Sequence, residues 1–110
     1  MYEMKNLARL SALKRTIPDT MAAFDAFGDA ALAEGALPRK VKELIAVAVA
    51  LTTQCPYCIE IHSKEARSAG ATDLELAETA MLAAVMRAGG AITHAAHLFP
   101  AAERIAQAAK

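Results

Sequence analysis

Two cysteines and a histidine stand close together in this chain, in a spacing that suits redox or metal chemistry. They form the segment Cys55-Pro56-Tyr57-Cys58, followed four residues later by His62, and the chain has no other cysteine. Two thiols at this spacing, with a titratable imidazole nearby, can act as a redox dithiol, a metal clamp or a structural staple. Which of these three roles applies depends on the secondary-structure elements that carry the residues.

The proline within this segment indicates that a helix begins there. Proline is favoured at the first helical position, which puts Cys55 near the N-cap and Cys58 in the first turn. Unpaired backbone N–H groups and the helix dipole stabilise an anion at this place and lower the pKa of a thiol. Cys58 is therefore the predicted thiolate nucleophile. His62 is predicted to lie one turn below on the same face and to exchange a proton with it.

A carboxylate interrupts the apolar segment that precedes the cysteines. Glu43 lies in KVKELIAVAVAL, and the turn that follows this segment is expected at residues 53–54. If the helices on either side of that turn form an antiparallel hairpin, Glu43 returns alongside His62, where a buried carboxylate would orient and charge the imidazole. The alternative is a solvated carboxylate that pairs with Lys40 or Lys42.

Zinc coordination is an alternative role for the cysteines. Cys55 and Cys58 would then be joined by His62, His94 or His97. The separation between Cys58 and His94 is too long for a compact zinc finger, and a cysteine pair inside a helix start is not a usual zinc knuckle. We therefore expect no metal and no other cofactor, and we expect His94 and His97 to be partly exposed or at an interface. Buried, unreactive cysteines are the remaining alternative.

Composition predicts the fold class. Alanine, Leu, Glu, Lys and Met are frequent while aromatic residues make up 5%, which is the usage of an all-α protein. By its length the chain is expected to be a single domain, residues 1–110. Six helices are expected, over residues 3–14, 18–35, 38 to the turn at 53–54, 55–70, 72–87 and from about 91 onward, the last kinked or split at Pro100.

The third of these helices is apolar nearly all round. Such a helix has to be buried centrally or against another subunit, and a chain of 110 residues offers few elements to enclose it. We therefore expect the chain to be an obligate homo-oligomer.

Charge and hydropathy exclude several classes of partner. Twelve basic and twelve acidic residues give a formal net charge of zero, so nucleic acid is not an expected partner. The longest apolar run, LIAVAVAL, is far shorter than the roughly 20 residues that span a bilayer, so no membrane segment is expected. The N-terminal residues lack the pattern of a secretory signal, which predicts a cytoplasmic location.

Taken together, Glu43, the two cysteines and His62 resemble a known signature. Their spacing, E-x11-C-x2-C-x3-H, is similar to that of the alkylhydroperoxidase D-like branch of the carboxymuconolactone decarboxylase family, and RAGGAITHAAHLF near the C-terminus adds to the resemblance. The similarity covers roughly residues 18–99. It implies an all-helical subunit assembled into trimers or hexamers, with a redox-active dithiol that reduces peroxides or passes electrons to a partner.

The resemblance also implies a role for each site residue. Cys58 corresponds to the peroxidatic cysteine, activated through His62 and Glu43, and Cys55 to the resolving cysteine. An external dithiol, such as a lipoyl or thioredoxin-like protein, would reduce the resulting disulfide. The best-known branch has a second histidine where this chain has Tyr57, and a phenol with a pKa near 10 is a poor general base at neutral pH.

Two other functions remain open. A lactone decarboxylase is possible because the family is named for one, although that branch does not depend on a CxxC pair. A redox-sensing dithiol protein without enzymatic turnover is the other. Of the three functions, the intact dithiol favours an antioxidant, thiol-dependent peroxidase.

Overall fold

The computed structural model describes residues 2–101, and within that range all regular secondary structure is helical. This confirms the predicted all-α class. The described part contains five α-helices and two short 3-10 helices. In chain order they are η1 (Met4–Arg9), α1 (Leu10–Thr16), α2 (Pro18–Leu32), α3 (Arg39–Thr53), α4 (Pro56–Ser68), α5 (Asp73–His94) and η2 (Ala95–Leu98).

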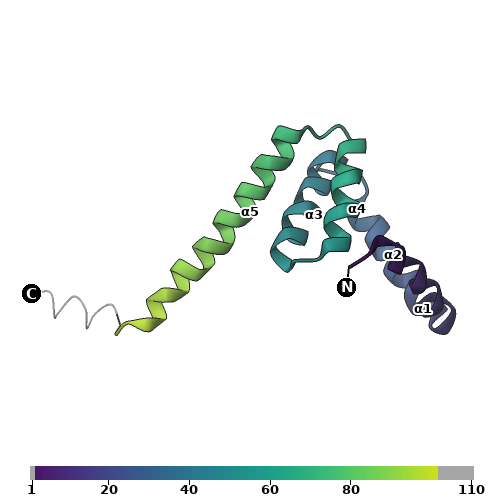
Figure 1. Cartoon of the computed structure of the whole chain (residues 1–110), viewed down its shortest axis with the longest axis horizontal. Coiled ribbons are helices and arrows are strands. Elements are labelled where there is room, and N and C mark those ends of the chain that lie inside the picture. Colours follow the sequence, from purple (N-terminus) through teal and green to yellow (C-terminus); the bar gives the residue numbers. More distant parts are fainter. Residues whose placement is uncertain (1, 102–110) are drawn as a thin grey trace, which may run out of the picture.

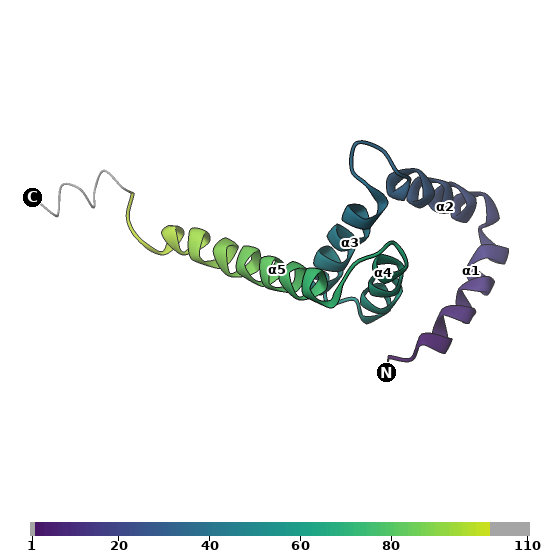
Figure 2. The same cartoon turned by 90° about the horizontal axis from the view of Figure 1, so that it is seen from above.

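Helix α3 lies at the centre of the molecule. It packs side by side with α4 as an antiparallel hairpin, while the start of α5 packs on another side of α3 (Figures 1 and 2). The two hairpin helices are joined by a very short turn, in which Gln54 takes the left-handed conformation (φ 57°) and the N–H of Cys55 donates to the carbonyl of Ala50 at 3.1 Å. The predicted central hairpin is therefore confirmed.

The helix starts follow local sequence rules. Thr72 and Glu75 form the predicted capping box: the Thr72 hydroxyl accepts from the Glu75 N–H at 3.1 Å, and the Glu75 carboxylate accepts from the Thr72 N–H at 2.9 Å. Both contacts satisfy N–H groups that the first turn of a helix leaves unpaired. Prolines mark three other starts, Pro18 and Pro56 at the first helical position and Pro38 at the N-cap.

The predicted break between the fifth and sixth helices is wrong. Gly89 and Gly90 lie inside α5, which runs unbroken to His94, and no new helix begins near residue 91. A glycine within a helix costs only about 1 kcal/mol relative to alanine, so two glycines flanked by strong helix formers weaken the helix without ending it. Of the segment predicted to follow Pro100, residues 102–110 lie outside the described part of the chain.

Two N-terminal boundaries also differ from the prediction. The helix expected over residues 3–14 is divided into η1 and α1, and Glu3, at the N-cap of η1, provides no side-chain cap. Helix α2 ends at Leu32 rather than at Gly35. Ala33 takes an extended conformation (ψ 146°), and the ammonium group of Lys42 stabilises this end by binding the carbonyl oxygens of Ala31 at 2.9 Å and Ala33 at 2.5 Å.

The described chain buries few apolar side chains. Its radius of gyration is 19.9 Å, whereas a compact domain of this size has about 13 Å. The described residues contain no helix that is both long and apolar enough to cross a membrane. The buried apolar residues are small and cluster around α3, where they hold the hairpin and the start of α5 together: Val47, Ala50, Ala66, Ala71 and Ala83.

Candidate active site

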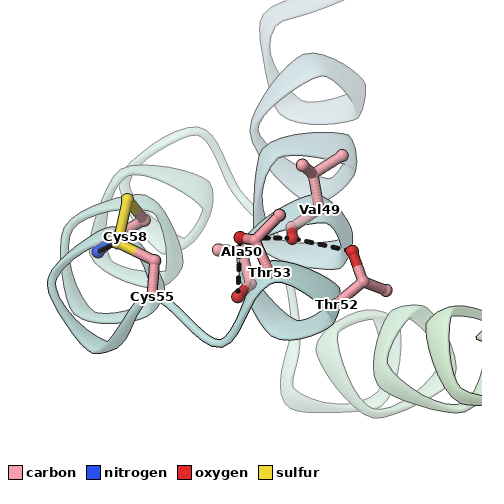
Figure 3. The surroundings of a disulfide bond; sticks show 6 residues. All are labelled: Val49, Ala50, Thr52, Thr53, Cys55 and Cys58. Atoms are coloured by element: carbon pink, nitrogen blue, oxygen red, sulfur yellow. Dashed lines mark hydrogen bonds between the residues drawn. A yellow bond between two sulfur atoms is a disulfide. The ribbon is translucent and has the colours of Figure 1, made fainter.

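The two cysteines lie at the N-terminus of α4, as predicted. Cys55 is the N-cap residue, its sulfur accepts from the N–H of Cys58 at 3.3 Å, and Pro56 takes the first helical position. Figure 3 shows the two sulfur atoms joined as a disulfide. The Cα atoms of the two cysteines are 5.3 Å apart. The pair therefore has the proximity that a reversible dithiol–disulfide cycle requires. Both residues are partly exposed.

The end of α3, which directly precedes the dithiol, is closed by side-chain hydrogen bonds. The hydroxyls of Thr52 and Thr53 donate to the carbonyl of Val49 at 2.8 Å and 2.9 Å (Figure 3). Arg87 of α5 donates to the carbonyl of Thr52 at 2.6 Å, which satisfies a group that the helix end leaves unpaired. These contacts come just before the turn at Gln54, and the dithiol begins at the next residue.

Glu43 and His62 meet between the two hairpin helices. The Oε2 atom of Glu43 lies 2.7 Å from Nδ1 of His62, the carboxylate side chain is fully buried, and the imidazole is 25% exposed. The predicted juxtaposition of Glu43 and His62 is therefore confirmed. The alternative, in which Glu43 is a solvated carboxylate, is wrong. Lys40 and Lys42 do not bind Glu43: Lys40 pairs with Glu75 at 2.9 Å, and Lys42 caps α2.

A pocket of about 340 Å³ is lined by both Cys58 of the dithiol and His62 of the Glu43–His62 pair. Most of its walls are apolar, and its two reactive side chains are the predicted nucleophile and the predicted base. Cys55 does not line it, so a molecule in this pocket meets Cys58 first. The lining residues are Ala46, Val49, Ala50, Thr53, Cys58 and His62.

The motif spacing does not single out Arg39 or Glu65, yet Arg39 contacts Glu43 and also pairs with Glu65. The guanidinium Nη2 of Arg39 is 3.4 Å from Oε1 of Glu43 and 3.7 Å from Oε2 of Glu65. Arg39 precedes Glu43 by four residues, which places both side chains on one face of α3. That spacing is the feature of the sequence from which the first contact could have been predicted.

The N-terminal segment contacts Tyr57, the residue between the cysteines. The rings of Tyr2 and Tyr57 meet edge to face with centroids 4.8 Å apart, and the Asn6 amide donates to the Tyr57 hydroxyl at 3.3 Å. The Tyr2 hydroxyl donates to the Glu60 carboxylate in a short hydrogen bond. This hydrogen bond, followed by burial and the Glu60 charge, raises the pKa of Tyr2 to about 12. Contacts across more than 50 residues leave no local pattern, so the sequence does not predict them.

The two C-terminal histidines lie apart from the dithiol. His94 and His97 face each other with ring centroids 5.4 Å apart, at the end of α5 and in η2. Figure 1 shows that this end of α5 extends away from the α3–α4 hairpin. Across residues 2–101, no three His, Cys, Asp or Glu side chains gather as they would around a metal ion.

Relatives of the chain come from several bacteria. An uncharacterized protein of the cox locus of Paracoccus denitrificans is 53% identical over 73 residues, which cover 66% of each chain, just under two thirds of that protein's length. An uncharacterized protein of Cupriavidus necator is 40% identical over 82 residues. These residues cover 74% of this chain and 71% of the length of that protein.

Solved structures share the fold. A carboxymuconolactone decarboxylase family protein from Legionella pneumophila, crystallised in its apo form, superposes with a TM-score of 0.72 and 38% identity over 84% of this chain and 82% of its own. A protein from Methanobacterium thermoautotrophicum gives a TM-score of 0.76 and 38% identity over 80% of this chain and 99% of its own.

The family model matches the same region. The model described as the carboxymuconolactone decarboxylase family aligns with residues 18–101, the range that contains α2 to α5 together with the dithiol, Glu43 and His62. The chain therefore belongs to the carboxymuconolactone decarboxylase family.

Proposed function

We propose that this protein is a thiol-dependent peroxidase of the alkylhydroperoxidase D-like branch, an oxidoreductase that reduces hydroperoxides with electrons from a dithiol. One observation carries the proposal. Cys58 and His62 line the same pocket, His62 is hydrogen-bonded to the buried carboxylate of Glu43, and Cys55 lies within disulfide distance of Cys58. This arrangement supplies a nucleophile, a base with its orienting group, and a resolving thiol.

The first step is activation of the thiol. In the reduced protein, the Cys58 thiol gives its proton to Nε2 of His62, directly or through a water molecule, while Glu43 accepts a hydrogen bond from Nδ1–H and stabilises the imidazolium. The first turn of α4 adds the partial positive charge of the helix N-terminus at the thiolate. Both effects favour the anion that attacks the peroxide.

The redox steps then balance without a cofactor. The Cys58 thiolate attacks the terminal oxygen of ROOH, the O–O bond breaks, and the departing alkoxide takes a proton to give ROH and a Cys58 sulfenic acid. The Cys55 thiol attacks this sulfenic acid, which forms the disulfide and releases water. An external dithiol reduces the disulfide by thiol–disulfide exchange and is itself oxidised to a disulfide.

Tyr57 affects the second half of this cycle in the proposal. Its phenol is a poor base at neutral pH, so Cys55 is less readily activated than a thiol beside a histidine would be. Its hydroxyl, which accepts from Asn6, can donate a hydrogen bond near the dithiol. The reductant is proposed to be a dithiol carried by a lipoyl or thioredoxin-like partner.

A thiol titration combined with turnover tests the function. The reduced protein receives one equivalent of an alkyl hydroperoxide, and two free thiols per chain are expected to be lost and then recovered with dithiothreitol. With excess dithiothreitol and hydroperoxide, continued formation of ROH is expected, and it should stop in Cys58→Ser. Thiol loss without turnover would indicate a redox sensor instead, and no thiol loss would contradict peroxide chemistry altogether.

A further inference from the structure

The Glu43 carboxylate has a partner at each of its oxygens. Oε2 meets Nδ1 of His62 at 2.7 Å, and Oε1 meets Nη2 of Arg39 at 3.4 Å. The carboxylate is fully buried, while the Arg39 side chain is 49% exposed. A buried carboxylate is stable as an anion only when it is paired. The Arg39 guanidinium therefore affects the charge of the Glu43–His62 pair.

Other charges around the pair are few. From α4, Glu65 lies 3.7 Å from Arg39 and partly offsets its positive charge. Cys58 faces the same pocket as His62 but does not titrate while it is in the disulfide. From α5, which packs against α3, Glu75 is paired with Lys40.

Lys42 is a cation on the α2 side of α3, but its ammonium group is bound to backbone carbonyls of Ala31 and Ala33. Arg39 is thus the cation that contacts the Glu43 carboxylate in the described part of the chain.

We propose that Arg39 is a positioning residue for the proton relay: its guanidinium keeps Glu43 ionised and oriented, and disfavours a second positive charge on His62. Nδ1–H is then donated to Glu43, and Nε2 is available to take the Cys58 proton. The role of the relay rests on the proposed peroxidase function. The charge coupling between Arg39 and His62 does not, and it can be measured separately.

The sign of the effect follows from electrostatics. A nearby positive charge favours the neutral form of an imidazole, so removal of the guanidinium should stabilise the imidazolium and move the titration midpoint of the His62 ring to higher pH. The Glu43 carboxylate lies between the two charges at a partly solvated site, where a screened interaction corresponds to about half to one pH unit. A change of this size is well within reach of NMR.

The experiment follows the histidine Cε1–H resonances through a pH titration of the disulfide form, in which Cys58 cannot contribute. Arg39→Gln is expected to raise the His62 midpoint by about half to one pH unit. Arg39→Lys keeps the charge, so its His62 midpoint is expected to stay close to that of the unmodified protein. His94 and His97 provide internal references that should not move. The His62 resonance is assigned by its absence in His62→Gln.

Lys40→Gln is the matched control, because it removes a positive charge from the neighbouring position of α3, where the side chain pairs with Glu75 instead. An unchanged or lowered His62 midpoint in Arg39→Gln would overturn the proposal, as would an equal shift in Lys40→Gln. Arg39→Met, which keeps an apolar stem, replaces Arg39→Gln if circular dichroism shows loss of helix.

A second measurement links this coupling to chemistry. The rate of Cys58 oxidation by an alkyl hydroperoxide is measured against pH, and in Arg39→Gln its acidic limb should move to higher pH by the same amount as the NMR midpoint. An unshifted limb would overturn the role in the relay. If the unmodified protein does not react with hydroperoxide, the proposed function fails, while the ring titration still decides whether Arg39 acts on His62.

Discussion

At the scale of single residues, the two cysteines differ in what surrounds them. Cys58 lines the pocket with His62 and follows the N-terminus of α4 by a few residues, whereas Cys55 is the N-cap residue and does not line the pocket. We expect Cys58 to be the more nucleophilic thiol. With iodoacetamide at pH 7, the reduced Cys55→Ser variant should be alkylated faster than the reduced Cys58→Ser variant. The opposite order would reverse the two roles.

Glu43 and His62 are expected to act as one unit on Cys58. In the proposed mechanism, His62 can accept the thiol proton only when one tautomer and orientation is held, and the buried carboxylate 2.7 Å away is the group able to hold it. General-base assistance of this kind contributes roughly 10²–10⁴-fold, so Glu43→Gln, His62→Gln and the double variant should slow Cys58 oxidation to a similar degree.

Stopped-flow oxidation of each variant by an alkyl hydroperoxide provides the rates, with circular dichroism as the check on folding. If Glu43→Gln reacts at the unmodified rate while His62→Gln is slow, the relay reduces to a Cys58–His62 pair. In that case, the hydrogen bond between Glu43 and His62 would serve the packing of α3 on α4.

Local spacing explains why much of this site could be predicted and part of it could not. The dithiol at a helix start, His62 one turn later and Glu43 across a hairpin all follow from helical period and one short turn. The contact of Arg39 with Glu43 could be predicted from their spacing, but its proposed role required the knowledge that Glu43 is buried. The contacts of Tyr2 with Tyr57 depend on how η1 folds back, which no periodic pattern encodes.

At the scale of elements, helix starts were more predictable than helix ends. Proline and the capping box act on backbone groups within one turn, so Pro56 and Thr72 mark their helices correctly. The length of α5 depends instead on the sum of small propensities along 22 residues. That sum is large enough to carry the helix through Gly89 and Gly90, and for this reason the expected break there does not form.

The glycines of α5 and of the loop before it should respond oppositely to alanine. Gly89 lies in a helix, and a Cβ there would meet nothing within 4 Å in this chain, so Gly89→Ala should stabilise by about 1 kcal/mol. Gly70 has φ +100° with equally open surroundings, so Gly70→Ala should destabilise by about 1 kcal/mol through backbone strain alone.

Urea unfolding at one fixed protomer concentration measures both changes, because association contributes to apparent stability. A loss of stability in Gly89→Ala would contradict the expectation and would indicate that another helix approaches α5 closely at that point. A neutral Gly70→Ala would mean that the α4–α5 loop relaxes without cost.

At the scale of the whole molecule, one chain leaves large apolar side chains in contact with water. Phe27 of α2 and Val85 of α5 are 70% and 59% exposed, and Val49 on the central α3 is 53% exposed. Soluble monomers rarely expose large contiguous apolar patches. We propose that these faces are buried between copies of the chain, in a trimer or a hexamer, which would also enclose α3 as its sequence predicts.

Association of this kind is testable by light scattering at micromolar protomer concentration. The unmodified protein is expected to have the mass of a closed oligomer, since cyclic and dihedral assemblies are the usual outcome for identical chains. Phe27→Glu and Val85→Glu should each weaken association, because a charge placed in a buried apolar interface is strongly unfavourable. Lys64→Glu, at an exposed position of α4, is the matched control and should keep the oligomer intact.

A folded, stable monomer of the unmodified chain at this concentration would contradict the proposal. Its α2 and α5 faces would then be exposed in solution, and the small buried core around Val47 and Ala50 would have to stabilise the hairpin unaided.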